Sequence, residues 1–231
     1  MALGAALYGS AYWRVRQSAA RAASERLTAV VHQISGLLET QGVAIARAAL
    51  EAGRGKAVLR ALQSPAPATS ADAFAALRGG SAQDTSIAAL VLRDSTGGVL
   101  FTDGALGPEL ASLMGPDELP TTPHDTAVVG HFRALGGQIY FPAVAELTAG
   151  ERRLGYVVTW RRTGKAPHAR GPVAALIGSD AVLLIGSRTG AWMDESGPAQ
   201  APDLEARVRD GLSWYDRPEG PVIAAMADVA G

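Results

Sequence analysis

Four side chains in the middle of the sequence are the best candidates for binding a small molecule: Arg133, Tyr140, Trp160 and Arg161. Tyr140 and Trp160 are large and amphipathic, and they fall in segments that we expect to form neighbouring strands. Ligand sites are mostly apolar and carry a few placed polar groups, which suits two aromatic rings accompanied by two arginines. An aromatic side chain in a strand more often packs in the core, so a purely structural role stays open as the alternative.

The sequence contains no familiar catalytic or metal-binding motif. It has no G-x-S-x-G elbow, no P-loop, no G-x-G-x-x-G turn and no cysteine. His124, Asp125 and His131 lie close together in the sequence, but a metal site would want a third ligand and supporting hydrogen bonds. We therefore expect no enzymatic activity, no metal and no cofactor, and we expect these histidines to be solvated.

The remaining charged candidates are typical of turns and strand ends. Asp94 and Asp103 flank a predicted hairpin, where aspartate is commonplace because its side chain can bond the backbone ahead of it. Two arginine pairs, at residues 152–153 and 161–162, fall at the two ends of one predicted strand. We expect these arginines to be solvated, with an anion-facing role for one of them as the alternative.

Composition limits the class of protein. The chain has 231 residues, of which 48% are hydrophobic and 19% are charged, so it can bury a core. Its formal net charge of −1 gives no global attraction to nucleic acid.

Residues 1–13 are nearly all apolar or small and precede Arg14 and Arg16, but they are too few to span a bilayer, which needs about 20 residues. We interpret them as the remnant of a transmembrane segment, with an ordinary helix start as the alternative.

The chain is organised around a predicted β-hairpin at residues 138–162. Two runs rich in aromatic and β-branched side chains are separated by a short polar stretch that contains Gly150. This pattern is typical of a hairpin with a half-buried, pleated surface.

Before the hairpin, residues 5–52 lack proline and are rich in alanine, which predicts one long stalk helix. Seven mostly apolar positions recur there at alternating spacings of four and three, the pattern of a heptad seam; they are Leu27, Val31, Ile34, Leu38, Gln41, Ile45 and Ala48. We expect the part before about Leu27 to have little contact with the rest of the chain, and the second half to pack on the sheet. A second copy pairing through the seam would give a weak homodimer.

Shorter elements complete the first sheet. We expect helices at residues 56–63, 70–77 and 107–114, with Ser70 near the cap of the second. Strands are expected at residues 87–92, 99–102 and 126–135, and the DSTGG sequence at residues 94–98 has turn chemistry throughout.

A second, smaller set of strands follows a linker at residues 164–171 and a short helix at residues 172–178. The sequence VLLIGSRTGAWMD repeats the strand–turn–strand pattern of ALVLRDSTGGVLFTD, which predicts strands at residues 181–185 and 191–194. We expect a helical turn at residues 203–209 and strands at 212–217 and 221–229. This gives a stalk at residues 1–52, a distal sensor domain at 53–165 and a smaller proximal half at 166–231. We expect the proximal sheet to be incomplete, with the strand at 181–185 lacking a neighbour on one side.

The order of these elements resembles the extracytoplasmic Cache sensor domains of bacterial membrane receptors, in their double form. The likeness rests on VLRDSTGGVLFTDG, on YFPAVAEL with RRLGYVVTW, and on LLIGSRTGAWMD with WYDRPEGPVIAAMADV. It implies an α+β fold with PAS-like antiparallel sheets, anchored to the cell membrane by flanking segments and facing the periplasm. It further implies a small-molecule sensor of a histidine kinase or chemoreceptor. The Tyr, Arg, Trp-Tyr and Asp pattern of the amino-acid-binding members is absent between residues 110 and 140. The alternative function is a structural domain that binds no ligand and dimerises through the heptad helix.

Overall fold

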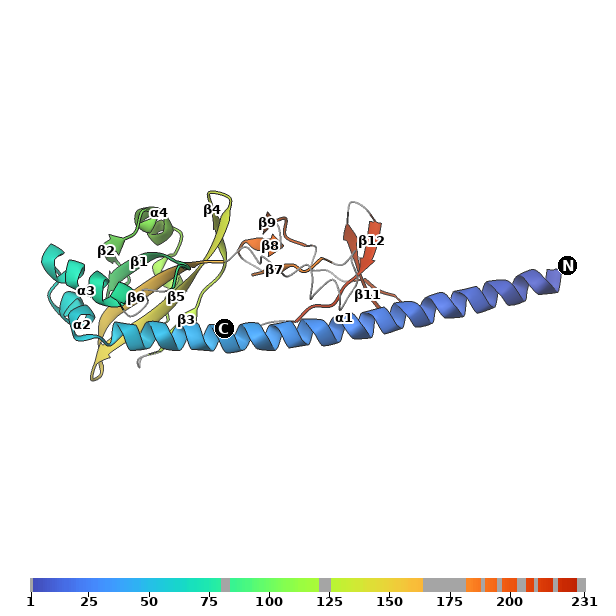
Figure 1. Ribbon diagram of the computed structural model, residues 1–231, viewed down its shortest axis with the longest axis horizontal. Coiled ribbons are helices and arrows are strands. Elements are labelled where there is room, and N and C mark those ends of the chain that lie inside the picture. The colour runs from blue at the N-terminus through green and yellow to red at the C-terminus, as the bar shows by residue number, and fades with distance from the viewer. Residues whose placement is uncertain are drawn as a thin grey trace. The chain divides into compact units, whose positions relative to one another are not determined.

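The computed structural model has an α+β architecture, with a long N-terminal helix followed by antiparallel sheets (Figure 1). It describes residues 2–79, 84–120, 126–163, 182–187, 190–194, 197–202, 207–209, 212–217 and 220–227. Side chains are described within these ranges for residues 12–202 and 224–227. The chain divides into two units: one comprises Met1–Leu38, His168–Val182 and Ala201–Ala230, and the other comprises Glu39–Pro167, Leu183–Gln200 and Gly231.

The predicted stalk is confirmed as one continuous helix, α1 (Ala2–Gly53). Most described side chains before Leu27 are exposed, whereas Ala46 and Ala49 are buried in the unit that contains the sheet. Five of the seven seam residues are half-buried, but Gln41 and Ala48 are exposed. Within the described residues, no helix is both long enough and apolar enough to cross a membrane.

The predicted central hairpin is confirmed by two long strands, β5 (Gln138–Ala149) and β6 (Arg152–Arg162). Gly150 in the turn between them has φ +63°, which a residue without Cβ adopts readily. On the other side of β6 lies β1 (Ile87–Asp94), which pairs in turn with β2 (Val99–Asp103). The strand order is therefore β2-β1-β6-β5-β3, with β4 also paired to β5.

The prediction of one strand at residues 126–135 is wrong. Two short strands, β3 (Ala127–Val129) and β4 (Arg133–Leu135), pair separately with β5. Opposite the break lies Pro142, which has no N–H to donate to the ladder. The N–H of Gly130 instead donates to the Pro142 carbonyl over 2.8 Å, and a Cβ on Gly130 would lie 2.8 Å from the proline ring.

Helices cover both faces of this sheet. One face carries α2 (Lys56–Gln63) and α3 (Pro67–Gly79), together with the last turns of α1. The other face carries α4 (Gly107–Ser112) and the 3-10 turn η1 (Pro116–Glu118). The bounds of α2 match the prediction. Helix α3 begins before Ser70, so Ser70 is not its cap; its hydroxyl donates to the Pro67 carbonyl inside the helix.

Two small sheets lie in the C-terminal part of the chain. One contains β7 (Ile185–Gly186), β8 (Trp192–Asp194) and β9 (Gly197–Ala199), and the other contains β10 (Arg207–Arg209), β11 (Leu212–Arg217) and β12 (Gly220–Ile223). The predicted pairing of the 181–185 and 191–194 segments is confirmed over shorter lengths, because Ile185 pairs with Met193. Strand β11 has the predicted bounds, β12 is shorter than predicted, and β9 was missed.

One prediction in this region is corrected, and others lie outside the described residues. Residues 207–209 form the strand β10 rather than a helical turn, because they pair with Leu212–Trp214 of β11. The predicted linker at 164–171, the helix at 172–178, residues 203–206 and His124 with Asp125 fall outside the described ranges. Among the described residues β7 pairs with β8, and β12 pairs with β11. The expectation that the 181–185 segment lacks a partner on one side stays a prediction.

Candidate functional site

Three of the four predicted ligand-binding residues lie near one another under α4, and the fourth does not. Tyr140 and Trp160 belong to one buried cluster on the α4 face of the sheet, and Arg133 is the cross-strand partner of Tyr140. Arg161 follows Trp160 on β6, so it points to the opposite face. The four side chains therefore cannot line one pocket in this sheet, and their role in binding stays a prediction.

The α4 face of the sheet is filled with side chains. Trp160 has no exposed surface and Tyr140 is 5% exposed. Both pack with apolar side chains of α4, of the segment that follows it and of the strands, namely Leu110, Ala111, Met114, Leu119, Val91, Val144 and Val158. The indole Nε1 of Trp160 is buried without a hydrogen-bond partner among the described residues. This packing forms a buried apolar cluster on the α4 face of the sheet.

Two arginines hold α4 and η1 on this face. The buried Arg93 donates from Nη1 to the Gly97 carbonyl and from Nη2 to the carbonyls of Ala111 and Met114 at the end of α4. Arg133 donates to the Leu113 carbonyl over 3.2 Å and pairs with Glu118 at 2.5 Å. Burial lowers the pKa of Arg93, opposed by the charges of Glu118 and Asp94. These bonds satisfy carbonyls at the end of α4, while the Nε of Arg93 is buried without a hydrogen-bond partner among the described residues.

Arg161 lies on the α1 side of the sheet. It donates to Asp84 at 2.5 Å and to the Ser86 hydroxyl at 3.0 Å. The pKa of Asp84 is lowered, since hydrogen bonds from Ser86 and Arg161 outweigh the opposing effect of burial. Next to Arg161 and Thr159 is a cavity of about 20 Å³ beneath Ala49, large enough for one water molecule. Arg161 thus ties the segment before β1 to the strand under α1.

A buried carboxylate was missed by the sequence analysis. Glu146 on β5 has no exposed surface, and Arg153 on β6 pairs with it at 2.5 Å between Nε and Oε1. The Thr126 hydroxyl lies 3.4 Å from Oε2, and the Arg153 guanidinium lies 5.4 Å from the centre of the Tyr156 ring. Burial raises the pKa of Tyr156, whose hydroxyl donates to the Pro120 carbonyl. The signal in the sequence was an acidic residue inside an apolar run, with an arginine across the predicted turn.

An open groove of about 420 Å³ lies between α3 and β2. Its lining is half apolar and half polar: Ser70, Ala71, Phe74, Ala75, Arg78, Phe101, Thr102 and Asp103. Arg78 and Asp103 form an ion pair at 2.5 Å within it. None of the four predicted binding residues lines this groove.

Metal chemistry finds no support in the described residues, which hold no group of three or more His, Cys, Asp or Glu side chains suited to a metal ion. His131 is exposed, and Asp94 is used in its own turn, where Oδ1 accepts from the backbone N–H groups of Thr96 and Gly98.

A scan against protein-family models and a search of curated proteins both find no match to this chain.

Proposed function

We propose that the chain is the extracytoplasmic input domain of a membrane-anchored signal-transduction receptor of the histidine kinase or chemoreceptor type. In this proposal, flanking segments anchor the chain in the cell membrane and α1 passes the state of the sheet toward it. The fold is proposed to be PAS-like, in the double Cache arrangement.

The strand order supports this proposal. A PAS-like sheet has its last strand in the middle, beside its first strand. If β3 and β4 count as one interrupted strand, the present sheet has the same arrangement. Its last strand, β6, lies in the middle and pairs with both β1 and β5. The helices on the two faces, and the Asp94 turn between β1 and β2, follow the order of elements expected from the resemblance.

The contact between α1 and the sheet supports the proposal that α1 responds to changes in the sheet. Ala49 packs on Ala143 and Ala145 of β5, and Gly53 approaches Leu147 so closely that a Cβ there would lie 3.1 Å from the leucine side chain. Contacts between such small residues bring α1 close to the sheet, and packed interiors do not deform continuously. A displacement of β5 would therefore displace α1.

The same helix has an exposed stripe suited to a second copy of the chain. Leu37, Gln41, Ala44 and Ala48 are all exposed and follow one another at spacings of four, three and four, so they share one side of the helix. Leu37 is the large apolar member, with 58% of its surface exposed. We propose that two copies pair weakly along this stripe, rather than through the half-buried Val31 and Leu38 of the predicted seam.

Light scattering on the purified chain tests this pairing. Leu37→Asp should make the protein monomeric at concentrations where the unaltered chain dimerises. Val43→Asp is the matched control, since Val43 is 56% exposed but lies on a different side of α1. Equal oligomeric states for the two variants would exclude the stripe as the contact.

A second candidate function is a structural domain that dimerises through α1 and binds no small molecule. The filled α4 face of the sheet favours it, because the expected position of a ligand is occupied by Trp160, Tyr140 and their neighbours. Thermal-shift screening of small carboxylates, amines and sugars separates the two functions. Stabilisation that is lost when Tyr140 is replaced by Ala would support sensing at the sheet, and stabilisation that persists would locate the ligand elsewhere.

A further inference from the structure

The groove between α3 and β2 has buried side chains at its base and is open to solvent on one side. Ser70 and Phe74 of α3 form buried parts of its lining, while Ala71 and Ala75 are exposed along its helical wall. Its volume of about 420 Å³ is within the range of small-ligand sites. Such sites usually enclose most of the ligand, however, whereas this groove is open along one side, which suits a chain lying on the surface.

The other wall is the edge of the sheet. Among the described residues, β2 pairs with β1 alone, so its outward N–H and C=O groups have no strand to bond (Figure 1). Leu92 pairs with Phe101 and Leu90 pairs with Asp103, which turns the side chains of Phe101 and Asp103 toward the face covered by α3. A bulge at Leu100 leaves residues 101–103 as the regular part of this edge. A strand added there would send alternate side chains into the groove.

The charges of the groove define what it would accept. Its two charged residues, Arg78 and Asp103, neutralise each other in an ion pair. The groove therefore complements an uncharged segment, because a charged side chain would have to compete with that pair. A second copy fits poorly, since antiparallel self-pairing of residues 101–103 would bring the carboxylate of Asp103 beside the ring of Phe101.

We propose that this groove binds an extended, uncharged peptide segment of a partner protein, which joins the sheet as a strand next to β2. The main chain of residues 101–103 would supply hydrogen bonds, and the space over Phe74, between Ala71 and Ala75 and the strand, would receive small or aliphatic side chains. This site is separate from the α4 face and from the exposed stripe of α1. It does not depend on the proposed receptor function.

Selection from a random peptide library displayed on phage, with the whole chain immobilised, tests the proposal. Ala75→Arg would fill the groove from an exposed helix position, and Ala76→Arg is the matched control because Ala76 is also exposed but does not line the groove. Circular dichroism establishes that both variants keep the fold. The enriched peptide is then synthesised with capped ends, both unmodified and with methylated main-chain nitrogens.

The proposal predicts that uncharged peptides are enriched and that Ala75→Arg weakens their binding about tenfold or more, while Ala76→Arg leaves it unchanged. Main-chain methylation should weaken binding to a similar extent, because it removes the donors of the added strand. Amide exchange of residues 101–103 should slow when the peptide is bound. Absence of any enrichment, equal binding to both variants, or full binding by the methylated peptide would overturn the proposal.

Discussion

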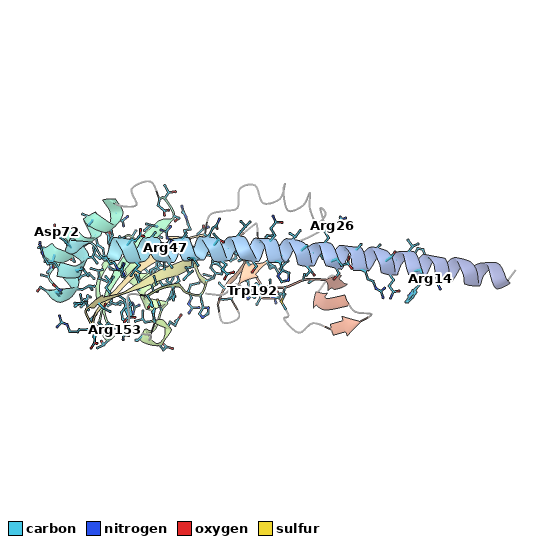
Figure 2. All side chains as sticks on the ribbon, turned by 90° about the horizontal axis from the view of Figure 1, so that it is seen from below. Arg14, Arg26, Arg47, Asp72, Arg153 and Trp192 are labelled. Atoms are coloured by element: carbon cyan, nitrogen blue, oxygen red, sulfur yellow. The ribbon has the colours of Figure 1, made fainter. Side chains whose placement is uncertain are left out.

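Replacing Arg153 by Met tests the buried ion pair that locks β5 to β6 near their turn. Glu146 has no exposed surface, while the Arg153 side chain is 31% exposed. Arg153 is one of the side chains labelled in Figure 2. Without the guanidinium, the carboxylate would keep only a weak contact to the Thr126 hydroxyl at 3.4 Å. Removing one partner of a buried pair costs about 3–5 kcal/mol, and partial access of water to the Arg153 site favours the lower end, about 3 kcal/mol.

A double-mutant cycle isolates the interaction. Glu146→Gln should cost about 1 kcal/mol, because water can solvate the half-exposed Arg153. The double variant should cost about 2 kcal/mol, less than the sum of the single changes, which gives a coupling of about 2 kcal/mol. Urea unfolding followed by circular dichroism measures each value. Arg152→Met, on the exposed neighbour, should stay within about 0.5 kcal/mol of the unaltered chain. A loss below about 1 kcal/mol for Arg153→Met would show that Glu146 is not held in a desolvated site.

Three other substitutions test local features of the fold. Hydrogen bonds, the strongest from the Thr96 hydroxyl, lower the pKa of Asp94 below its ordinary value of 3.8. The ionised Asp94 therefore stabilises the fold above pH 3.8, and this stabilisation is lost as the pH falls through the folded-state pKa. In Asp94→Asn, the urea concentration at the unfolding midpoint should therefore fall less steeply at acidic pH than in the unaltered chain. An equally steep fall would contradict the stabilising role of the ionised Asp94. Gly155→Ala should destabilise by about 2 kcal/mol, because Gly155 has φ +155° and a Cβ would press on the Arg93 carbonyl. Gly36→Ala, at an open position in α1, should stabilise by up to about 1 kcal/mol in thermal unfolding, and equal shifts for the two glycine variants would refute this account.

Local patterns predicted the elements that depend on local forces. The proline-free, alanine-rich stretch gave α1 its bounds to within a few residues, and the Gly150 turn between two β-favouring runs predicted the hairpin. The interruption between β3 and β4 has a different origin. It follows from Pro142 on the neighbouring strand, and pairing partners are not visible in a single segment.

The candidate site was harder to predict because its residues act through tertiary contacts. Arg93 lies in an apolar strand, but its partners are carbonyls at the end of α4, far away in the sequence. Arg161 was grouped with Trp160 by type, although adjacent strand residues point to opposite faces. Tyr140 and Trp160 have the composition expected of a pocket, but their burial against α4 depends on tertiary packing that the sequence does not display.

The most direct test of the central claim is a chimeric receptor in which this chain replaces the input domain of a membrane-bound histidine kinase. The buried Ala49 contacts β5, whereas Ala29 is exposed on the same helix and lies outside the stripe proposed to pair two copies. Ala49→Val should change kinase autophosphorylation, because overpacking costs about 1–3 kcal/mol at the contact between α1 and the sheet. Ala29→Val carries the same change in helix propensity and should leave autophosphorylation unaltered. Equal autophosphorylation for both variants and the unaltered chain, with circular dichroism showing that Ala49→Val remains folded, would contradict the proposal that α1 reports the state of the sheet.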